Sequence, residues 1–120
     1  MIALLLQMAQ LHSISPFSDE PAAAHALESV MQCVGDGLYN RRSDTRAGQI
    51  VTNEVRQLCL AQTNDLRAQL IAVFERNPVR LPAGATAGGA ADTCISNLLN
   101  RVEIVIDEAR AHEKAANAQN

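Results

Sequence analysis

Two of the three cysteines are placed so that their thiols could form a bond with each other. Cys33 and Cys59 lie at nearly equal distances from the polar stretch at residues 40–46. If the apolar segments on either side form antiparallel helices, residues equally far from the turn face one another. The spacing therefore predicts a disulfide, which would indicate an oxidising compartment. The alternative is a set of three unpaired cysteines that act as small apolar core residues of a cytosolic protein.

The third cysteine, Cys94, is predicted to be a free thiol. It sits near the start of the last helix-like segment, and antiparallel packing would place it roughly 20–25 Å from Cys59. That distance is beyond the reach of a disulfide. The chain also contains no Cys-x-x-Cys pair, so thiol redox catalysis and a tetrahedral zinc site are poor fits.

The other groups capable of acid, base or metal chemistry show no active-site pattern. His25 with Glu28, and Glu108 with His112, have same-face helical spacing, which is more typical of solvated pairs than of ligands. The chain lacks the two Glu-x-x-His pairs of di-iron bundles and the Gly-x-Ser-x-Gly turn of serine hydrolases. We therefore expect no catalytic residue, no metal site and no cofactor, and hence a protein that is not an enzyme.

One cluster of positive charge stands out, formed by Arg41, Arg42 and Arg46 in the polar stretch. It could bind an acidic partner or a phosphate group. Alternatively, the three arginines belong to a solvated turn and complement the negative carboxyl end of the preceding helix. The second interpretation is the more common use of such a cluster.

The composition favours helices and argues against nucleic-acid binding. The chain has 120 residues, a formal charge of −3 and 2 % aromatic residues. A domain of this size needs a small core, and one built from Leu, Ile, Val and Ala suits closely packed helices better than strands. A nucleic-acid interface would need a basic face, and a single-strand binder would add aromatic platforms. Neither is present in the sequence.

The pattern along the chain predicts one all-α domain over residues 18–112, an up-and-down bundle of three to four helices. A first helix follows the cap-like residues 18–20, with Gly35 and Gly37 near its end. A long second helix is capped by Ser43 or Asp44 and ends at residues 77–78. A loop rich in Gly, Ala and Pro covers residues 77–91. The last helix opens at Asp92 or Thr93, and residues 113–120 form a polar tail.

The apolar residues 1–14 leave two interpretations open. Their length fits the core of a signal peptide, although basic residues and a clear cleavage site are missing. They could instead form an amphipathic helix that presents Leu4, Met8 and Leu11 to a partner. The segment is too short to span a bilayer in either case.

These features favour an exported helical protein, periplasmic or secreted, that acts as a structural or protein-interaction module without catalysis. Its partner would be another protein or a second copy of the chain. A cytoplasmic adaptor, chaperone or regulatory subunit is the alternative, and it would use the N-terminal helix. A third class, a bundle that binds a small apolar ligand, would place its cavity near Met31, Gly35 and Gln62, where small and polar residues interrupt the core.

Overall fold

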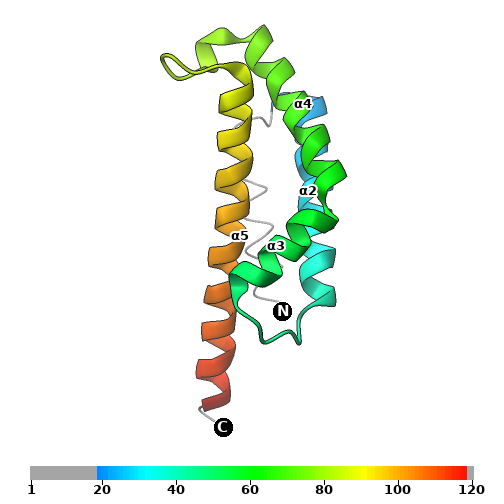
Figure 1. The fold of residues 1–120 in the computed structure, drawn as a ribbon, viewed down its shortest axis with the longest axis vertical. Helices are drawn as coiled ribbons and strands as arrows, with labels where there is room; N and C mark the ends of the chain where they lie inside the picture. Colours follow the sequence, from blue (N-terminus) through cyan, green and yellow to red (C-terminus); the bar gives the residue numbers. More distant parts are fainter. Residues whose placement is uncertain (1–18, 119–120) are drawn as a thin grey trace.

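The computed structural model describes residues 19–118, which form four α-helices and one short 3-10 turn (Figure 1). The elements are α2 (Pro21–Asn40), α3 (Gly48–Leu58), α4 (Leu60–Arg76), η1 (Pro78–Arg80) and α5 (Ala87–Ala118). The described residues contain no strand. The prediction of an all-α bundle with three to four helices is therefore confirmed.

Helix α4 is the central helix of the arrangement. It packs against α2 on one side and α5 on the other, whereas α2 and α5 are not neighbours within the described part of the chain. The chain runs down α2, up through α3 and α4, and down again along α5 (Figure 1). Helix α3 leans across the lower end and contacts both α2 and α5. The bundle is consequently held together by consecutive helices.

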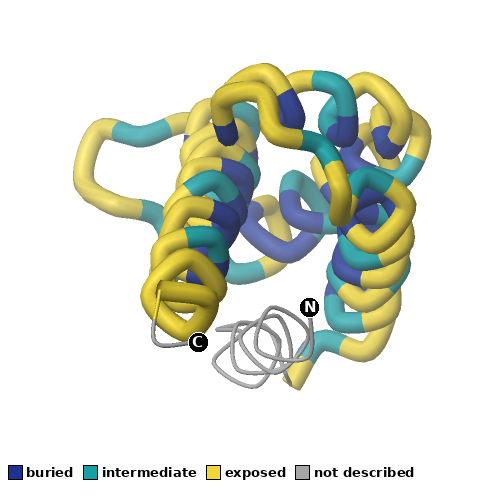
Figure 2. The backbone as a smooth tube through the Cα atoms, turned by 90° about the horizontal axis from the view of Figure 1, so that it is seen from below, coloured by how far each residue is buried: buried dark blue, intermediate teal, exposed yellow. Residues whose placement is uncertain are grey.

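Valine and alanine supply most of the core. The side chains facing inward in Figure 2 include the fully buried set of Val30, Val34, Val55, Val73, Val102 and Val105. Buried alanines, such as Ala26 in α2 and Ala91 in α5, add little bulk at the contacts. Small side chains let helices approach closely, which explains how a chain with so few aromatic residues forms a continuous core.

The upper end of the bundle is tied by ion pairs. Pro21 occupies the first turn of α2, where proline is tolerated, and Glu20 precedes it at the N-cap position. The Glu20 carboxylate accepts hydrogen bonds from Arg76 at 3.0 Å and from the Asn77 amide at 3.3 Å. These contacts join the start of α2 to the end of α4, where helix formation stops at Pro78 as predicted.

The second helix differs from the prediction at its start and in its middle. It begins at Gly48 because Asp44 does not cap it: the Asp44 side chain accepts a hydrogen bond from the Arg46 backbone N–H at 2.9 Å. Such an Asx turn keeps this stretch out of the helix. The helix is then interrupted at Cys59, which separates α3 from α4.

The last helix is longer than predicted at both ends. It begins at Ala87 because the hydroxyl of Thr86 accepts a hydrogen bond from the Gly89 N–H at 3.0 Å, as an N-cap residue does. Helix α5 continues to Ala118 through an alanine-rich stretch that lacks Gly and Pro. Residues 113–118 are exposed but helical, and residues 87–91 belong to the helix rather than to the loop.

The two glycines of α2 do not end the helix, and they have different surroundings. A Cβ added at Gly35 would have no neighbour within 4 Å, whereas one at Gly37 would lie 3.2 Å and 3.3 Å from the two methyl groups of Val55. Gly37 therefore provides the close approach between α2 and α3, one of the two roles considered from the sequence.

This contrast predicts opposite effects of one substitution at two nearby positions. Gly35→Ala should stabilise the protein by about 0.5–1 kcal/mol, because alanine loses less backbone entropy in a helix. Gly37→Ala should destabilise it, since the buried, β-branched Val55 has little freedom to move aside. Thermal unfolding followed by circular dichroism compares the two variants directly. Equal stabilisation by both would show that the α2–α3 contact has room for a methyl group.

Candidate functional site

The predicted cysteine pair is joined in the structure. The sulfur atoms of Cys33 and Cys59 lie 2.09 Å apart, at disulfide bond distance, and their Cα atoms are 5.9 Å apart. Cys33 lies within α2 and Cys59 lies at the break between α3 and α4. Cys59 is fully buried and Cys33 is partly exposed. The bond therefore links α2 to the middle of the opposing helical segment, as the prediction requires.

Cys94 is a free cysteine on α5. It lies at an open hollow between the end of α4, the 81–86 loop and the start of α5, which is also lined by Phe74, Arg80 and Thr93. Burial raises the pKa of the Cys94 thiol, which reduces the thiolate fraction and hence its nucleophilicity. Nothing in these surroundings activates Cys94 as a catalytic nucleophile.

Two of the three clustered arginines cap the end of α2. Arg41 donates to the Gly37 carbonyl at 3.2 Å and also to the Glu54 carboxylate of α3 at 3.2 Å. Arg42 donates to the Tyr39 carbonyl at 2.9 Å, and its guanidinium lies 4.3 Å from the centre of the Tyr39 ring. Both side chains satisfy carbonyls of the last helical turn, where a positive charge also complements the helix dipole.

Arg46 forms the centre of an ion-pair network. Its guanidinium contacts the Asp44 carboxylate at 2.7 Å and Glu54 at 2.8 Å. Hydrogen bonding to Arg46 lowers the pKa of Asp44 to about 2 and also lowers the pKa of Glu54. The structure thus brings Arg41 and Arg46 together through Glu54, a residue that the sequence interpretation did not assign to this cluster.

Arg110 of α5 is a further member that the sequence did not reveal. Its guanidinium donates to the backbone carbonyls of Arg46 at 2.6 Å and Asp44 at 2.8 Å. It therefore fixes the 41–47 turn against the last helix. No local signal could indicate this contact, because its partners are more than 60 residues apart and are backbone atoms.

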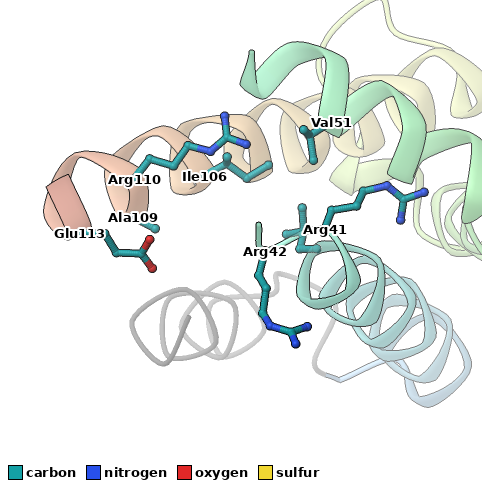
Figure 3. A pocket seen from close by; sticks show the side chains of 8 residues that line it. Arg41, Arg42, Val51, Ile106, Ala109, Arg110 and Glu113 are labelled. Carbon is teal, nitrogen blue, oxygen red and sulfur yellow. The ribbon is translucent and has the colours of Figure 1, made fainter. Parts of the chain in front are cut away.

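A hollow lies beneath this turn, between the ends of α2 and α3 and the side of α5 (Figure 3). Its polar rim is formed by Arg41, Arg42, Arg110 and Glu113, and its apolar wall by Leu38, Val51, Ile106 and Ala109. Its volume of about 40 Å³ is far below the several hundred Å³ of a typical ligand site. The hollow does not suit an organic substrate.

The remaining candidates lie apart from these two places. His25, Glu28, Glu108 and His112 are exposed on the surfaces of α2 and α5. Gln62 is half-buried in the first turn of α4. Leu4, Met8 and Leu11 lie outside the described residues. Between residues 19 and 118, no cluster of three or more His, Cys, Asp or Glu side chains could hold a metal ion.

No described helix combines the length and the apolar character needed to span a membrane. No protein-family model, curated protein or solved structure matches this chain. The candidate sites must therefore be interpreted from their own geometry, which consists of a disulfide between helices and an arginine-rich turn whose charges are engaged internally.

The ion-pair network predicts a loss of stability in acid. Because the Asp44 pKa is lowered in the folded protein, its contribution is fully present above the unfolded value near 4. That contribution is lost as the pH falls towards 2. Asp44→Asn should therefore lower the melting temperature at pH 7 and weaken its decline between pH 4 and 2. Thermal unfolding from pH 7 to 2 at low ionic strength measures both effects.

The control is Asp36→Asn, which changes an exposed carboxylate of α2 that has no ion pair among the described residues. It should leave the pH dependence unchanged. A salt concentration of about 1 M should reduce the difference between wild type and Asp44→Asn, since exposed pairs are screened. Identical acid profiles for all three proteins would contradict the role assigned to Asp44.

Proposed function

We propose that this protein is an exported, non-enzymatic helical module that acts by binding another protein. The observation that carries the proposal is the Cys33–Cys59 pair at bonding distance. Disulfides persist in oxidising compartments and are rare in the reducing cytosol. A bond between helices is also the kind of support that a small domain with few aromatic residues needs.

The chemistry of the described surface supports binding more than catalysis. The hollow below the turn is too small for an organic substrate, and the hollow beside Cys94 contains a thiol that burial deactivates. Exposed apolar side chains are available for protein contacts: Leu58 and Leu60 on either side of the Cys59 break are 57 % and 48 % exposed, and Val79 in η1 is 92 % exposed.

The arginine-rich turn is a weaker candidate for the binding surface. Arg41, Arg46 and Arg110 already contact carboxylates or backbone carbonyls. An acidic partner would have to compete with these internal contacts. The apolar side chains around Cys59 and in η1 have no such competition, so we place the partner contact there.

The test is an intact-mass measurement on the natively expressed protein, alkylated without prior reduction. The proposal predicts one alkylated thiol, Cys94, a Cys33–Cys59 cross-linked peptide after digestion, and recovery of the protein outside the cytosol. Three alkylated thiols on a cytosolic chain would contradict export and favour the adaptor. Removal of residues 1–11 from the recombinant protein then separates a dispensable leader, which leaves helicity intact, from a segment that the fold requires.

A further inference from the structure

The break at Cys59 divides a helix that the local sequence would continue. The stretch from Gln49 to Asn77 contains no Gly and no Pro, the residues that usually break helices. The break falls between Leu58 and Leu60, and leucine is a good helix former. Figure 1 shows α3 and α4 meeting at an angle at this point. The cause of the bend is therefore not in the local helix propensity.

The apolar pattern also passes through the bend without a change of phase. The buried residues on either side are Val55, Cys59, Thr63, Leu66 and Leu70, at steps of three or four residues. This is the spacing of one face of an uninterrupted helix. A single straight helix over residues 48–76 would thus present the same face to α2, so burial alone does not require the bend.

Two features act on the bend. One is the bond from Cys59 to Cys33, which holds the bend against α2. The other is the Thr63 hydroxyl, which donates to the carbonyls of Cys59 at 3.3 Å and Leu60 at 3.0 Å. Hydroxyl bonding to the preceding turn is a known cause of modest helix bending. The bond is a covalent constraint, whereas the hydroxyl adds only a weak hydrogen bond.

The bent arrangement leaves polar groups around it unsatisfied. Buried atoms of Thr52 and Arg56 in α3 and of Gln62 in α4 have no hydrogen-bonding partner within the described part of the chain. Buried polar groups without partners are costly. Their concentration on the segments that meet at Cys59 indicates that this region is held in its arrangement by something other than its own hydrogen bonds.

We propose that the Cys33–Cys59 bond is a redox-sensitive switch for the shape of the α3–α4 segment. With the bond formed, α3 bends at Cys59 and covers α5 through Val51 and Val55. With the bond reduced, α3 and α4 join into one helix over residues 48–76, and α3 moves away from α5. The apolar surface that α3 covers, including Ile106 beside the lower hollow, then becomes accessible.

The reductant in this switch is a dithiol. Its thiolate attacks the partly exposed Cys33 sulfur, and Cys59 leaves as a thiolate that takes up a proton. The second thiol of the reductant then displaces Cys33, which also takes up a proton. Two electrons pass to the protein, which gains two thiols, and the dithiol becomes a disulfide. Reoxidation reverses the change, so the switch works in both directions.

The experiment measures the distance between spin labels on α3 and α4 by pulsed electron resonance. The exposed residues Gln49 and Glu75 are replaced by a ketone-bearing amino acid, which takes the labels without using cysteine chemistry. A straight helix would separate these two Cα atoms by about 39 Å. We expect a shorter distance in the oxidised protein, a shift to about 39 Å with dithiothreitol, and a return on reoxidation.

Cys33→Ala provides the matched variant because it removes the bond without changing the α3–α4 sequence. It should show the long distance without reductant. Labels at Arg101 and Lys114, both exposed on α5, provide the control pair, whose distance should not respond. An unchanged Gln49–Glu75 distance after reduction would overturn the proposal. So would the broad distribution of an unfolded chain, since the switch requires a folded, reduced form.

Thr63→Val tests the proposal without depending on the stability of the reduced protein. It removes the hydroxyl and keeps the disulfide and the side-chain shape. If the disulfide holds the bend, the oxidised Thr63→Val protein retains the short distance. A shift to about 39 Å in that variant would assign the bend to the hydroxyl and would also overturn the proposal.

Discussion

Loss of the Cys33–Cys59 bond should lower the free energy of unfolding by about 3–4 kcal/mol. The two cysteines are 26 residues apart, and cross-linking a loop of that length reduces the entropy of the unfolded chain by an equivalent amount in the chain-entropy model. Small domains are stable by only about 5–15 kcal/mol, so this is a large fraction. Urea unfolding of the oxidised protein and of Cys33→Ala measures the difference.

The control for this prediction is Cys94→Ala, which removes the free, half-buried cysteine. It should shift the urea midpoint much less than Cys33→Ala, and addition of a reductant should then lower the stability of Cys94→Ala as it does that of the wild type. A reduced wild type as stable as the oxidised one would contradict the structural role of the bond, even if the bond forms in the cell.

Phe74→Ala should destabilise the protein by about 3–5 kcal/mol, which is the usual effect of removing a buried phenylalanine. Phe74 is 4 % exposed near the end of α4 and belongs to the main core cluster. Valine and alanine dominate the rest of that core, so few flexible side chains are present to fill the space. Urea unfolding at pH 7 without reductant gives the difference directly.

Phe74→Leu is the matched control, because it keeps most of the apolar volume and should cost less than about 1.5 kcal/mol. A similar large loss in both variants would point to the ring itself rather than to volume. A loss below about 1 kcal/mol in Phe74→Ala would mean that the nearby hollow beside Cys94 collapses into the vacated space.

The sequence predicted the features that depend on periodicity and chain distance. Apolar residues at helical spacing indicated α2, the α3–α4 region and α5, and the equal distance of Cys33 and Cys59 from the turn predicted their pairing. Both arguments work because an antiparallel helical hairpin has nearly one geometry. The separation of Cys94 from the pair followed from the same geometry, and Cys94 is free in the structure.

The features that escaped prediction depend on contacts between distant residues or on competing local signals. Asp44 was interpreted as a helix cap, but its carboxylate bonds to Arg46 instead. Gly88 and Gly89 suggested a loop, although Thr86 caps a helix that includes both. The bend at Cys59 and the contact of Arg110 with the 41–47 turn have no local sequence signal, because each needs the folded partner to exist.

The neighbour-to-neighbour packing of the helices has a consequence for the order of events during maturation. Since α2 and α5 do not meet in the described structure, most contacts join segments that are close along the chain. Helical topologies of that kind fold in microseconds to milliseconds, whereas uncatalysed disulfide formation takes seconds to hours. We therefore expect collapse to precede oxidation, so that a thiol oxidant meets Cys33 and Cys59 already side by side and has little opportunity to link either of them to Cys94.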